Sequence, residues 1–368
     1  MWDTKGRSVP LGDGLCPIMV PVCTIRSVKH KLLFENRFIS VFYTAILDIP
    51  IWHDPCVIKY QLFCLFRETR VRTGNLMEFG KRRKISTDAV AGKSQVDGAG
   101  MNPIGEVVAR KANLLEELFS LKGKIALITG GTRGIGRAIA DAYAAAGADL
   151  VVTARDLCGC QAAATEISAR YGVKAVGKEM NVKNVERIDA VLKEVVDEFG
   201  KIDILVNSAG IAGSEKPVLR MTDEDMAEVM SVDFYGTFFV SRSVGQVMVR
   251  KKSGKIINIC SILGKVAARN MAGYCASKAA ILQLTRVMAL ELMQDNIQVN
   301  AISPGYFVTD FSRGFLDMEM GKKFMANKIP MKRAGNPDEI KSTAIYLATC
   351  PPYLTGAEIS IDGGHSIV

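Results

Sequence analysis

The residues with the clearest chemical potential are a tyrosine, a lysine and a serine in the last third of the chain. Tyr274 and Lys278 are four residues apart, so on a helix their side chains lie on one face, one turn apart. A free tyrosine loses its proton near pH 10, and a neighbouring ammonium favours the phenolate and lowers that pKa. Ser261 follows an apolar strand and can polarise a carbonyl by hydrogen bonding. Together they predict acid–base chemistry on an alcohol or a ketone.

A glycine-rich turn, TGGTRGIG over 129–136, follows an apolar strand and opens a helix. Glycines let the backbone turn tightly and approach a pyrophosphate, whose charge is stabilised at the helix N-terminus. The strand–turn–helix context favours a dinucleotide site over a turn without a ligand. The predicted cofactor-binding residues here are Gly130, Thr132, Arg133, Gly134, Ile135 and Gly136.

The end of the second strand indicates which dinucleotide is used. An NAD site normally has an acid there for the ribose 2′-hydroxyl, whereas this strand ends in Ala154 and Arg155. Arg133 and Arg155 together could clamp a 2′-phosphate, which favours NADP, with NAD as the alternative. Both arginines could instead be solvated surface residues, and Asp156 beside Arg155 leaves that interpretation open.

The elements that must position these residues alternate between strand and helix from Met101 onward. Apolar strands are expected at 124–129, 149–153, 175–178, 202–206, 255–259, 297–302 and 354–361. Helices are expected at 136–147, 161–171, 185–199, 223–249 and 274–293. Strands that are apolar on both faces indicate a parallel sheet buried between two helical layers. The predicted fold class is therefore α/β, a doubly wound, Rossmann-like parallel sheet.

The first hundred residues have a different character and carry most of the net charge. They hold 15 Lys/Arg against 9 Asp/Glu, which is +6 of the total of +9. They show no sustained helical or strand period, and their basic cluster Lys81–Lys84 is expected to be a solvated charge run rather than a nuclear or polyanion signal. We expect residues 1–100 to form an irregular or poorly ordered basic extension and residues 101–368 to form a single catalytic domain.

Composition excludes several other classes of protein. The chain is 48% hydrophobic and 23% charged, which is typical of a globular protein, and its last 268 residues carry only +3, so no nucleic-acid partner is predicted. Three histidines and nine scattered cysteines suggest no metal site, and the odd cysteine count favours a reducing, cytoplasmic location. The apolar run 38–47 is well short of the roughly 20 residues that a membrane-spanning helix needs, so no membrane association is predicted.

Taken together, these motifs resemble the short-chain dehydrogenase/reductase family over about 121–368. The resemblance is carried by the glycine turn, Asn207–Gly210, Ser261, the Tyr274/Lys278 pair and Pro304-Gly305 with Thr309. It implies that Tyr274 exchanges the proton, that Lys278 lowers its pKa and holds the nicotinamide ribose, and that Ser261 orients the substrate oxygen. It further implies that the remaining cofactor contacts come from Asn181, Val182, Asn207, Ala209, Gly210, Pro304, Gly305 and Thr309.

Two positions depart from the family pattern. Ser208 replaces the second Asn of the usual Asn-Asn-Ala-Gly, a change we expect to be mild. Asp233 stands where the family has an Asn that holds a water linking the lysine to solvent. Its carboxylate could still bind that water, or could pair with the Lys278 ammonium and weaken its help to Tyr274. We expect activity to survive, and we count Asp233 among the catalytic residues.

Within the family, the segments around the catalytic residues are most similar to gluconate 5-dehydrogenases. The expected function is an NADP-preferring oxidoreductase that interconverts a secondary alcohol and a ketone, with a sugar acid as the best candidate. The alternatives are a 3-oxoacyl-carrier-protein reductase and an NADP-binding regulator with little turnover. Residues 309–331 predict either a lid over an apolar pocket or a helix packed on its own subunit. The resemblance also implies a homotetramer or homodimer.

Overall fold

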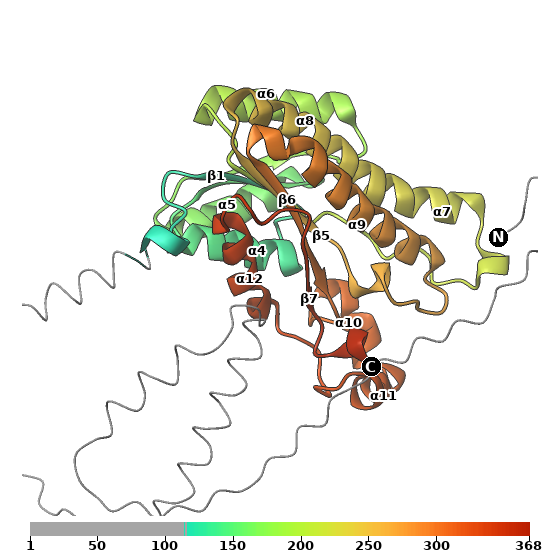
Figure 1. Cartoon of the computed structure of the whole chain (residues 1–368). Coiled ribbons are helices and arrows are strands. Elements are labelled where there is room, and N and C mark those ends of the chain that lie inside the picture. Colours follow the sequence, from blue (N-terminus) through green and yellow to red (C-terminus); the bar gives the residue numbers. More distant parts are fainter. Residues whose placement is uncertain (1–113, 115) are drawn as a thin grey trace, which may run out of the picture. The chain divides into compact units, whose positions relative to one another are not determined.

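The computed structural model describes residue 114 and residues 116–368 (Figure 1). The predicted extension, with its basic cluster, lies outside the described residues. The strands are β1 (Ile125–Thr129), β2 (Asp149–Ala154), β3 (Ala175–Glu179), β4 (Ile204–Asn207), β5 (Gly254–Ile259), β6 (Ile297–Pro304) and β7 (Glu358–Ile361). The main helices are α4 (Gly134–Ala145), α5 (Leu157–Tyr171), α6 (Val185–Phe199), α7 (Asp223–Val229), α8 (Gly236–Lys251), α9 (Ala272–Leu292), α10 (Asp310–Asp317), α11 (Glu319–Lys328) and α12 (Lys341–Thr349).

The seven strands form one parallel sheet in the order β3-β2-β1-β4-β5-β6-β7, which confirms the predicted fold class. Successive residues of β1 point to opposite faces, and all five are buried. Ala126 and Ile128 join a core beneath α4, α5 and α12, whereas Ile125 and Leu127 join a core beneath α6, α8 and α9. Two helical layers therefore cover the sheet, as Figure 1 shows. This double burial explains why the strands are apolar throughout.

The chain reverses its direction of winding at the centre of the sheet. β1 pairs with β2 on one side and with β4 on the other, both in parallel. The loops that follow β1 and β4 therefore leave the sheet toward different helical layers and open a crevice at its carboxyl edge. The fold thus places a binding crevice next to the glycine turn.

A ladder of buried amides and hydroxyls joins the centre of the sheet to both α8 and α9. The Asn207 amide donates to Ser241 Oγ of α8 at 2.8 Å and to Asn258 Oδ1 of β5 at 2.9 Å. The Asn258 amide donates to Thr285 Oγ1 at 2.9 Å, and Thr285 donates to the Ile281 carbonyl of α9 at 2.8 Å. Because these side chains are buried, the ladder fixes the register between β4, β5 and the helix that carries Tyr274.

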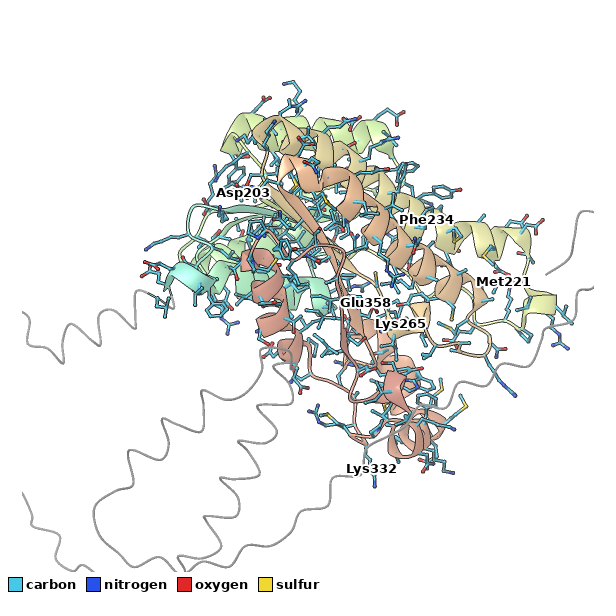
Figure 2. All side chains as sticks on the ribbon, in the orientation of Figure 1. Asp203, Met221, Phe234, Lys265, Lys332 and Glu358 are labelled. Atoms are coloured by element: carbon cyan, nitrogen blue, oxygen red, sulfur yellow. The ribbon has the colours of Figure 1, made fainter. Side chains whose placement is uncertain are left out.

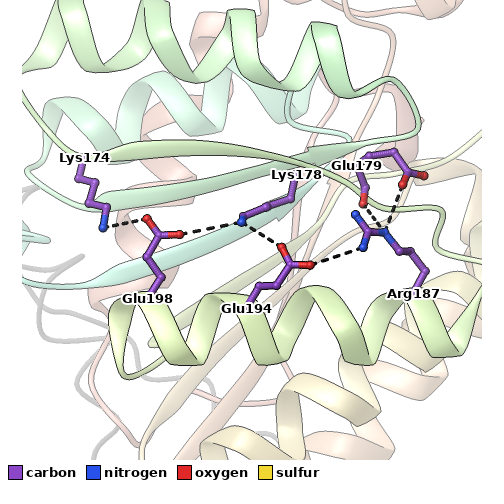
Figure 3. A network of polar contacts seen from close by, with 6 residues as sticks. All are labelled: Lys174, Lys178, Glu179, Arg187, Glu194 and Glu198. Atoms are coloured by element: carbon purple, nitrogen blue, oxygen red, sulfur yellow. Dashed lines mark hydrogen bonds and ion pairs between the residues drawn. The ribbon is translucent and has the colours of Figure 1, made fainter.

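The edge strand β3 is covered by charged residues that connect it to α6 (Figure 3). Lys178 contacts Glu194 at 3.0 Å, and Arg187 contacts Glu179 at 3.2 Å. Lys174 pairs with Glu198 at 2.9 Å. Exposed pairs of this kind add little stability each, but charges on an edge strand discourage pairing with another chain.

The helix expected over 223–249 is continuous but changes its winding in the middle. α7 passes into a π-helical turn, Met230–Tyr235, before α8 begins. The last strand is shorter than predicted because Gly356, at φ +73°, breaks the extended backbone before Glu358. α12 was not predicted from the sequence.

Candidate active site

All the predicted site residues lie at the carboxyl edge of the sheet. The glycine turn follows β1, Arg155 follows β2, and Asn181 and Val182 follow β3. Asn207–Gly210 follows β4, Ser261 follows β5, and Pro304, Gly305 and Thr309 follow or end β6. Segments that are far apart in the sequence therefore converge on the crevice created by the reversal of winding.

The glycine turn is packed tightly against the loop after β4. Gly130 has φ +64°, and a Cβ there would lie 3.0 Å from the backbone of Ala209. The Thr129 hydroxyl accepts hydrogen bonds from the backbone N–H groups of Ser208 and Ala209, both at 3.1 Å. Gly136 packs against the Gly130 carbonyl with no room for a side chain. The two loops therefore hold one another in place.

The N-terminus of α4 has no capping side chain. Arg133 is the residue before the helix, its side chain makes no capping hydrogen bond, and the first turn contains no acidic residue. The unpaired N–H groups and the helix dipole are thus directed into the crevice without an internal anion to satisfy them. This arrangement suits a phosphate group.

The two arginines that we expect to bind the 2′-phosphate are available to a ligand. Among the described residues, neither Arg133 nor Arg155 forms an ion pair, and both are exposed. Asp156 instead caps α5, accepting from the Cys158 and Gly159 amides at 3.2 and 3.0 Å. Arg137 is occupied by Asp141 and Glu166 at 3.2 and 2.8 Å. The adjacent acid therefore does not neutralise Arg155.

Ser261 is held so that its hydroxyl hydrogen remains available. Its Oγ accepts from the Leu263 amide at 3.1 Å at the start of a short 3-10 turn. The same loop is attached to β7 by Lys265, which contacts Glu358 at 3.0 Å; Figure 2 shows the two residues close together. An oxygen that already accepts from the backbone can direct its own O–H toward a substrate oxygen.

Tyr274 and Lys278 lie on one face of α9, as their spacing predicts. The Lys278 Nζ is 5.3 Å from the centroid of the Tyr274 ring. It also donates to the Ile259 carbonyl at 3.4 Å and pairs with Asp233 Oδ2 at 3.1 Å. The lysine is buried, so both oxygens replace water that its ammonium would otherwise need.

Asp233 is fully buried and lies in the π-helical turn between α7 and α8. Its Oδ1 accepts from the Ile211 amide at 2.8 Å, in the loop after β4. A Cβ on Gly210 would lie 3.3 Å from both carboxylate oxygens and from Lys278 Nζ, so a side chain there would crowd this contact. The ion pair between Asp233 and Lys278 that the sequence allowed is therefore present.

The pKa values of this group are set by burial as well as by charge. Burial raises the pKa of Tyr274, Lys278 lowers it, and Asp233 raises it again, with the result above the ordinary value. The expected effect of Lys278 is present, since its ammonium lowers the Tyr274 pKa, but burial and Asp233 together outweigh it. Burial alone would lower the pKa of Lys278, but Asp233 raises it above its usual range.

The other predicted cofactor residues have clear structural surroundings. The Asn181 side chain accepts from the Lys183 amide at 3.1 Å, and Val182 lies against Gly236. Gly305 packs on the backbone of Asp362, with no space for a Cβ. Thr309 begins α10 in a capping box with Ser312 and lies beside Gly134. The strand ends and the lid are therefore brought to the glycine turn.

The aromatic side chains of segment 309–331 lie in two different surroundings. Phe311 is exposed and its ring lies 6.0 Å from that of Tyr274, so it faces the reacting group. Phe315 and Phe324 instead pack on Tyr306, with centroids 5.6 and 5.2 Å away. His365 completes this aromatic cluster from the C-terminal turn. The contact between Phe311 and Tyr274 was missed, because only the apolar richness of the segment was visible in the sequence.

Residues 114 and 116–368 contain neither a cluster of metal-ligating side chains nor a membrane-spanning helix. No three His, Cys, Asp or Glu side chains in this part of the chain lie close enough to hold a metal ion. In the same region, none of the helices combines the length and apolar character required to cross a bilayer.

Comparisons with known proteins agree with this geometry. Residues 130–366 match the family profile described as "Enoyl-(Acyl carrier protein) reductase". A 3-oxoacyl-acyl-carrier-protein reductase of Aquifex aeolicus is 38% identical over 67% of this chain and 98% of its own. A 2-dehydro-3-deoxy-D-gluconate 5-dehydrogenase of Formosa agariphila is 37% identical over 67% of this chain and 94% of its own.

A solved structure extends the comparison. The gluconate 5-dehydrogenase of Burkholderia cenocepacia in complex with NADP and tartrate is 33% identical, with a TM-score of 0.67 over 69% of this chain and 99% of that one. The chain therefore belongs to the short-chain dehydrogenase/reductase family, whose members oxidise CH–OH groups or reduce keto groups.

Proposed function

We propose that the protein is an NADP-preferring oxidoreductase that interconverts a secondary alcohol and a ketone, with residues 101–368 as its catalytic unit. The observation that carries this proposal is the grouping of Tyr274, Lys278 and Ser261 at the carboxyl edge of the sheet, beside an uncapped helix N-terminus. The odd number of cysteines underlies our placing of the protein in the cytoplasm.

The crevice has the features that a phosphorylated dinucleotide requires. The α4 N-terminus offers free N–H groups for the pyrophosphate, and Arg133 and Arg155 offer free guanidiniums for a 2′-phosphate. Lys278 holds the nicotinamide ribose. The adenine and nicotinamide ends are assigned to the residues named from the family pattern, which are Thr132, Ile135, Asn181, Val182, Asn207, Ala209, Gly210, Pro304, Gly305 and Thr309.

In the proposed reaction the cofactor provides the hydride and a side chain provides the proton. When bound, NADPH supplies the hydride that the carbonyl carbon receives. Tyr274 gives its phenolic proton to the carbonyl oxygen and is left as the phenolate, and Ser261 donates a hydrogen bond to the same oxygen as negative charge develops there. Lys278 stabilises the phenolate until water returns the proton. In the direction of oxidation, Tyr274 accepts the proton instead.

A sugar acid of the 5-ketogluconate type is our best candidate substrate. Support comes from the relatives whose names include gluconate 5-dehydrogenase. A 3-oxoacyl thioester is the second candidate, because the relative from Aquifex aeolicus carries that name and because Phe311 offers an apolar surface beside Tyr274. An NADP-binding regulator is a third alternative, favoured only by the unusual Asp233.

We further propose that the protein forms a homotetramer or a homodimer. The outer face of α9 exposes Val287 and Leu290 in the single chain, and the turn that follows α9 exposes Met293. Three large apolar residues along one helical stripe are typical of a surface that is covered in an assembly.

The test is to follow oxidation of NADPH and of NADH by the full-length protein with 5-keto-D-gluconate and with a 3-oxoacyl thioester. We expect turnover of the sugar acid, faster with NADPH. The Tyr274→Phe variant should have a kcat lower by a factor of about 10² or more, because it cannot donate the proton. Its affinity for NADPH should be unchanged. Tyr346→Phe is the matched control, because the Tyr346 side chain is exposed on α12.

Each other outcome changes the assignment. Turnover of the thioester alone would move the protein to fatty-acid synthesis. NADPH binding without turnover of either substrate would favour the regulator. Absence of NADPH binding would contradict the proposal as a whole.

A further inference from the structure

The surroundings of Asp233 are suited to a carboxylate and not to the amide of the family pattern. Its Oδ1 accepts from the Ile211 amide at 2.8 Å, and its buried Oδ2, which forms no hydrogen bond within the described residues, lies 3.1 Å from the Lys278 ammonium. A carboxylate accepts on both sides, whereas an asparagine would have to turn its own NH₂ group toward one of these donors. The side chain is fully buried, so water cannot easily correct such a mismatch. The chain is therefore built around a negative charge at this position.

That charge changes the electrostatics around the reacting tyrosine. The charged groups nearest to Tyr274 are Lys278 on the same helix and Asp233 on the π-helical turn, and they act on its pKa in opposite directions. The remaining titratable groups are neutral or remote. The Cys260 thiol, at the end of β5, has its pKa raised to about 12 by burial. Tyr306 lies beyond, with Glu215 acting on it from the loop after β4 and Cys275 from α9.

A neutral pair gives the phenolate less support than a lone ammonium would. With Asn in place of Asp233, the full positive charge of Lys278 would favour the ionised tyrosine. With the carboxylate 3.1 Å from Nζ, part of that effect is offset, because both charges are buried and weakly screened. The tyrosine consequently keeps its proton to a higher pH.

We propose that Asp233 is a positioning residue that acts through Lys278 as a built-in counter-ion, holding the proton on Tyr274 and so preparing the site for carbonyl reduction. The inference rests on the proposed function. The chemical step is unchanged: hydride goes to the carbonyl carbon, the Tyr274 proton goes to the carbonyl oxygen, and solvent returns a proton to the phenolate. What Asp233 alters is the pH range over which Tyr274 is a donor rather than an acceptor.

The discriminating variant is Asp233→Asn, which removes the charge and keeps the size. Asp203→Asn is a matched control, because Asp203 likewise accepts from a backbone amide, that of Ile125 at 2.8 Å, and pairs with a lysine, Lys201 at 2.8 Å. It precedes β4 and so lies at the opposite, amino edge of the sheet; Figure 2 labels it together with Phe234, the neighbour of Asp233.

The first readout needs neither cofactor nor substrate. Phenolate absorbance is titrated in the full-length protein, and the signal of Tyr274 is obtained by subtracting the titration of Tyr274→Phe in each background. We expect Asp233→Asn to move the Tyr274 midpoint to lower pH by about one unit, a tenfold change in the phenolate fraction. Asp203→Asn should leave it in place. An unmoved or raised midpoint in Asp233→Asn would overturn the proposal.

The second readout is the pH profile of alcohol oxidation with NADP. The rising limb, which reports the phenolate, should shift to lower pH in Asp233→Asn, with about tenfold faster oxidation on that limb. A uniform loss of activity at every pH, without a shift, would indicate a purely structural role and contradict the proposal. If no substrate is turned over, the titration still tests Asp233, so failure of the proposed function is seen separately.

Discussion

At the scale of single residues, the proposed preference for NADP depends on Arg133 and Arg155, which form no ion pair within the described part of the chain. Charge-assisted hydrogen bonds to phosphate contribute about 1.5–3 kcal/mol each, so we expect Arg155→Ala or Arg133→Ala to raise the KM for NADPH by roughly 10- to 100-fold. The KM for NADH, which lacks the 2′-phosphate, should change little. Arg170→Ala, an exposed arginine at the end of α5, is the control. Equal losses with both cofactors would contradict this assignment.

The same arginines show what could and could not be read from single residues. Their presence and the absence of an acid at Ala154 are visible in the sequence. Whether Asp156 neutralises Arg155 is not, because that depends on which N–H groups its oxygens accept from, and the structure shows them engaged in capping α5. Likewise, the identity of Asp233 was visible, but its contacts with the Ile211 amide and with Lys278 depend on how the loop after β4 and α9 are placed in the fold.

At the scale of elements, the buried ladder through Asn258 holds the strands and α9 in register. Asn258→Ala removes the acceptor of Asn207 and the donor to Thr285, all within the core. We expect the free energy of unfolding to fall by about 2–4 kcal/mol, from two buried partners left unsatisfied plus a small cavity. Urea denaturation measures this loss.

A matched comparison separates the ladder from ordinary loss of a side chain. Asn184 caps α6 at the surface by accepting from the Arg187 amide at 2.7 Å, and its replacement by Ala should cost only about 1 kcal/mol. The two variants remove the same atoms from different environments. If Asn258→Ala were no more destabilising than Asn184→Ala, the ladder would not have the structural importance given to it here.

Elements were predictable from the sequence wherever periodicity was strong. The range of α6 was predicted without error, and six strands were within two residues of their observed ends. The π-helical turn was not predictable, because Met230, Val232 and Phe234 alternate in a way that fits either winding of the helix. Asp233 lies in this turn and pairs there with Lys278. The sequence pattern alone does not show this change of winding.

At the scale of the whole molecule, the topology of the sheet brings together candidate site residues that are far apart in the sequence. Side chains that span more than 170 positions of the sequence, from Gly130 to Thr309, meet because all seven strands end at one edge. The repeated alternation of strand and helix was enough to predict this convergence. The substrate was not predictable in the same way, since the segment places Phe311 beside Tyr274 but packs Phe315 and Phe324 on Tyr306.

The outer face of α9 provides the prediction for the assembly. Leu290 is 70% exposed in the single chain, between Val287 and Met293. In an interface with two-fold symmetry each substitution occurs twice, so Leu290→Glu would place two carboxylates in a surface that excludes water. We expect sedimentation at micromolar concentration to show the wild type as a tetramer or dimer and Leu290→Glu as a smaller species that keeps its helical content.

A substitution on another exposed helix shows whether added charge alone has this effect. Ala162→Glu introduces the same carboxylate on the outer face of α5 and should leave the assembly intact, because α5 exposes no comparable row of large apolar side chains. A monomeric wild type, or an unchanged assembly in Leu290→Glu, would refute the interface. Dissociation of Leu290→Glu together with an intact Ala162→Glu assembly would instead locate it on the helix that carries Tyr274 and Lys278, linking the stability of the assembly to the element that positions the reacting groups.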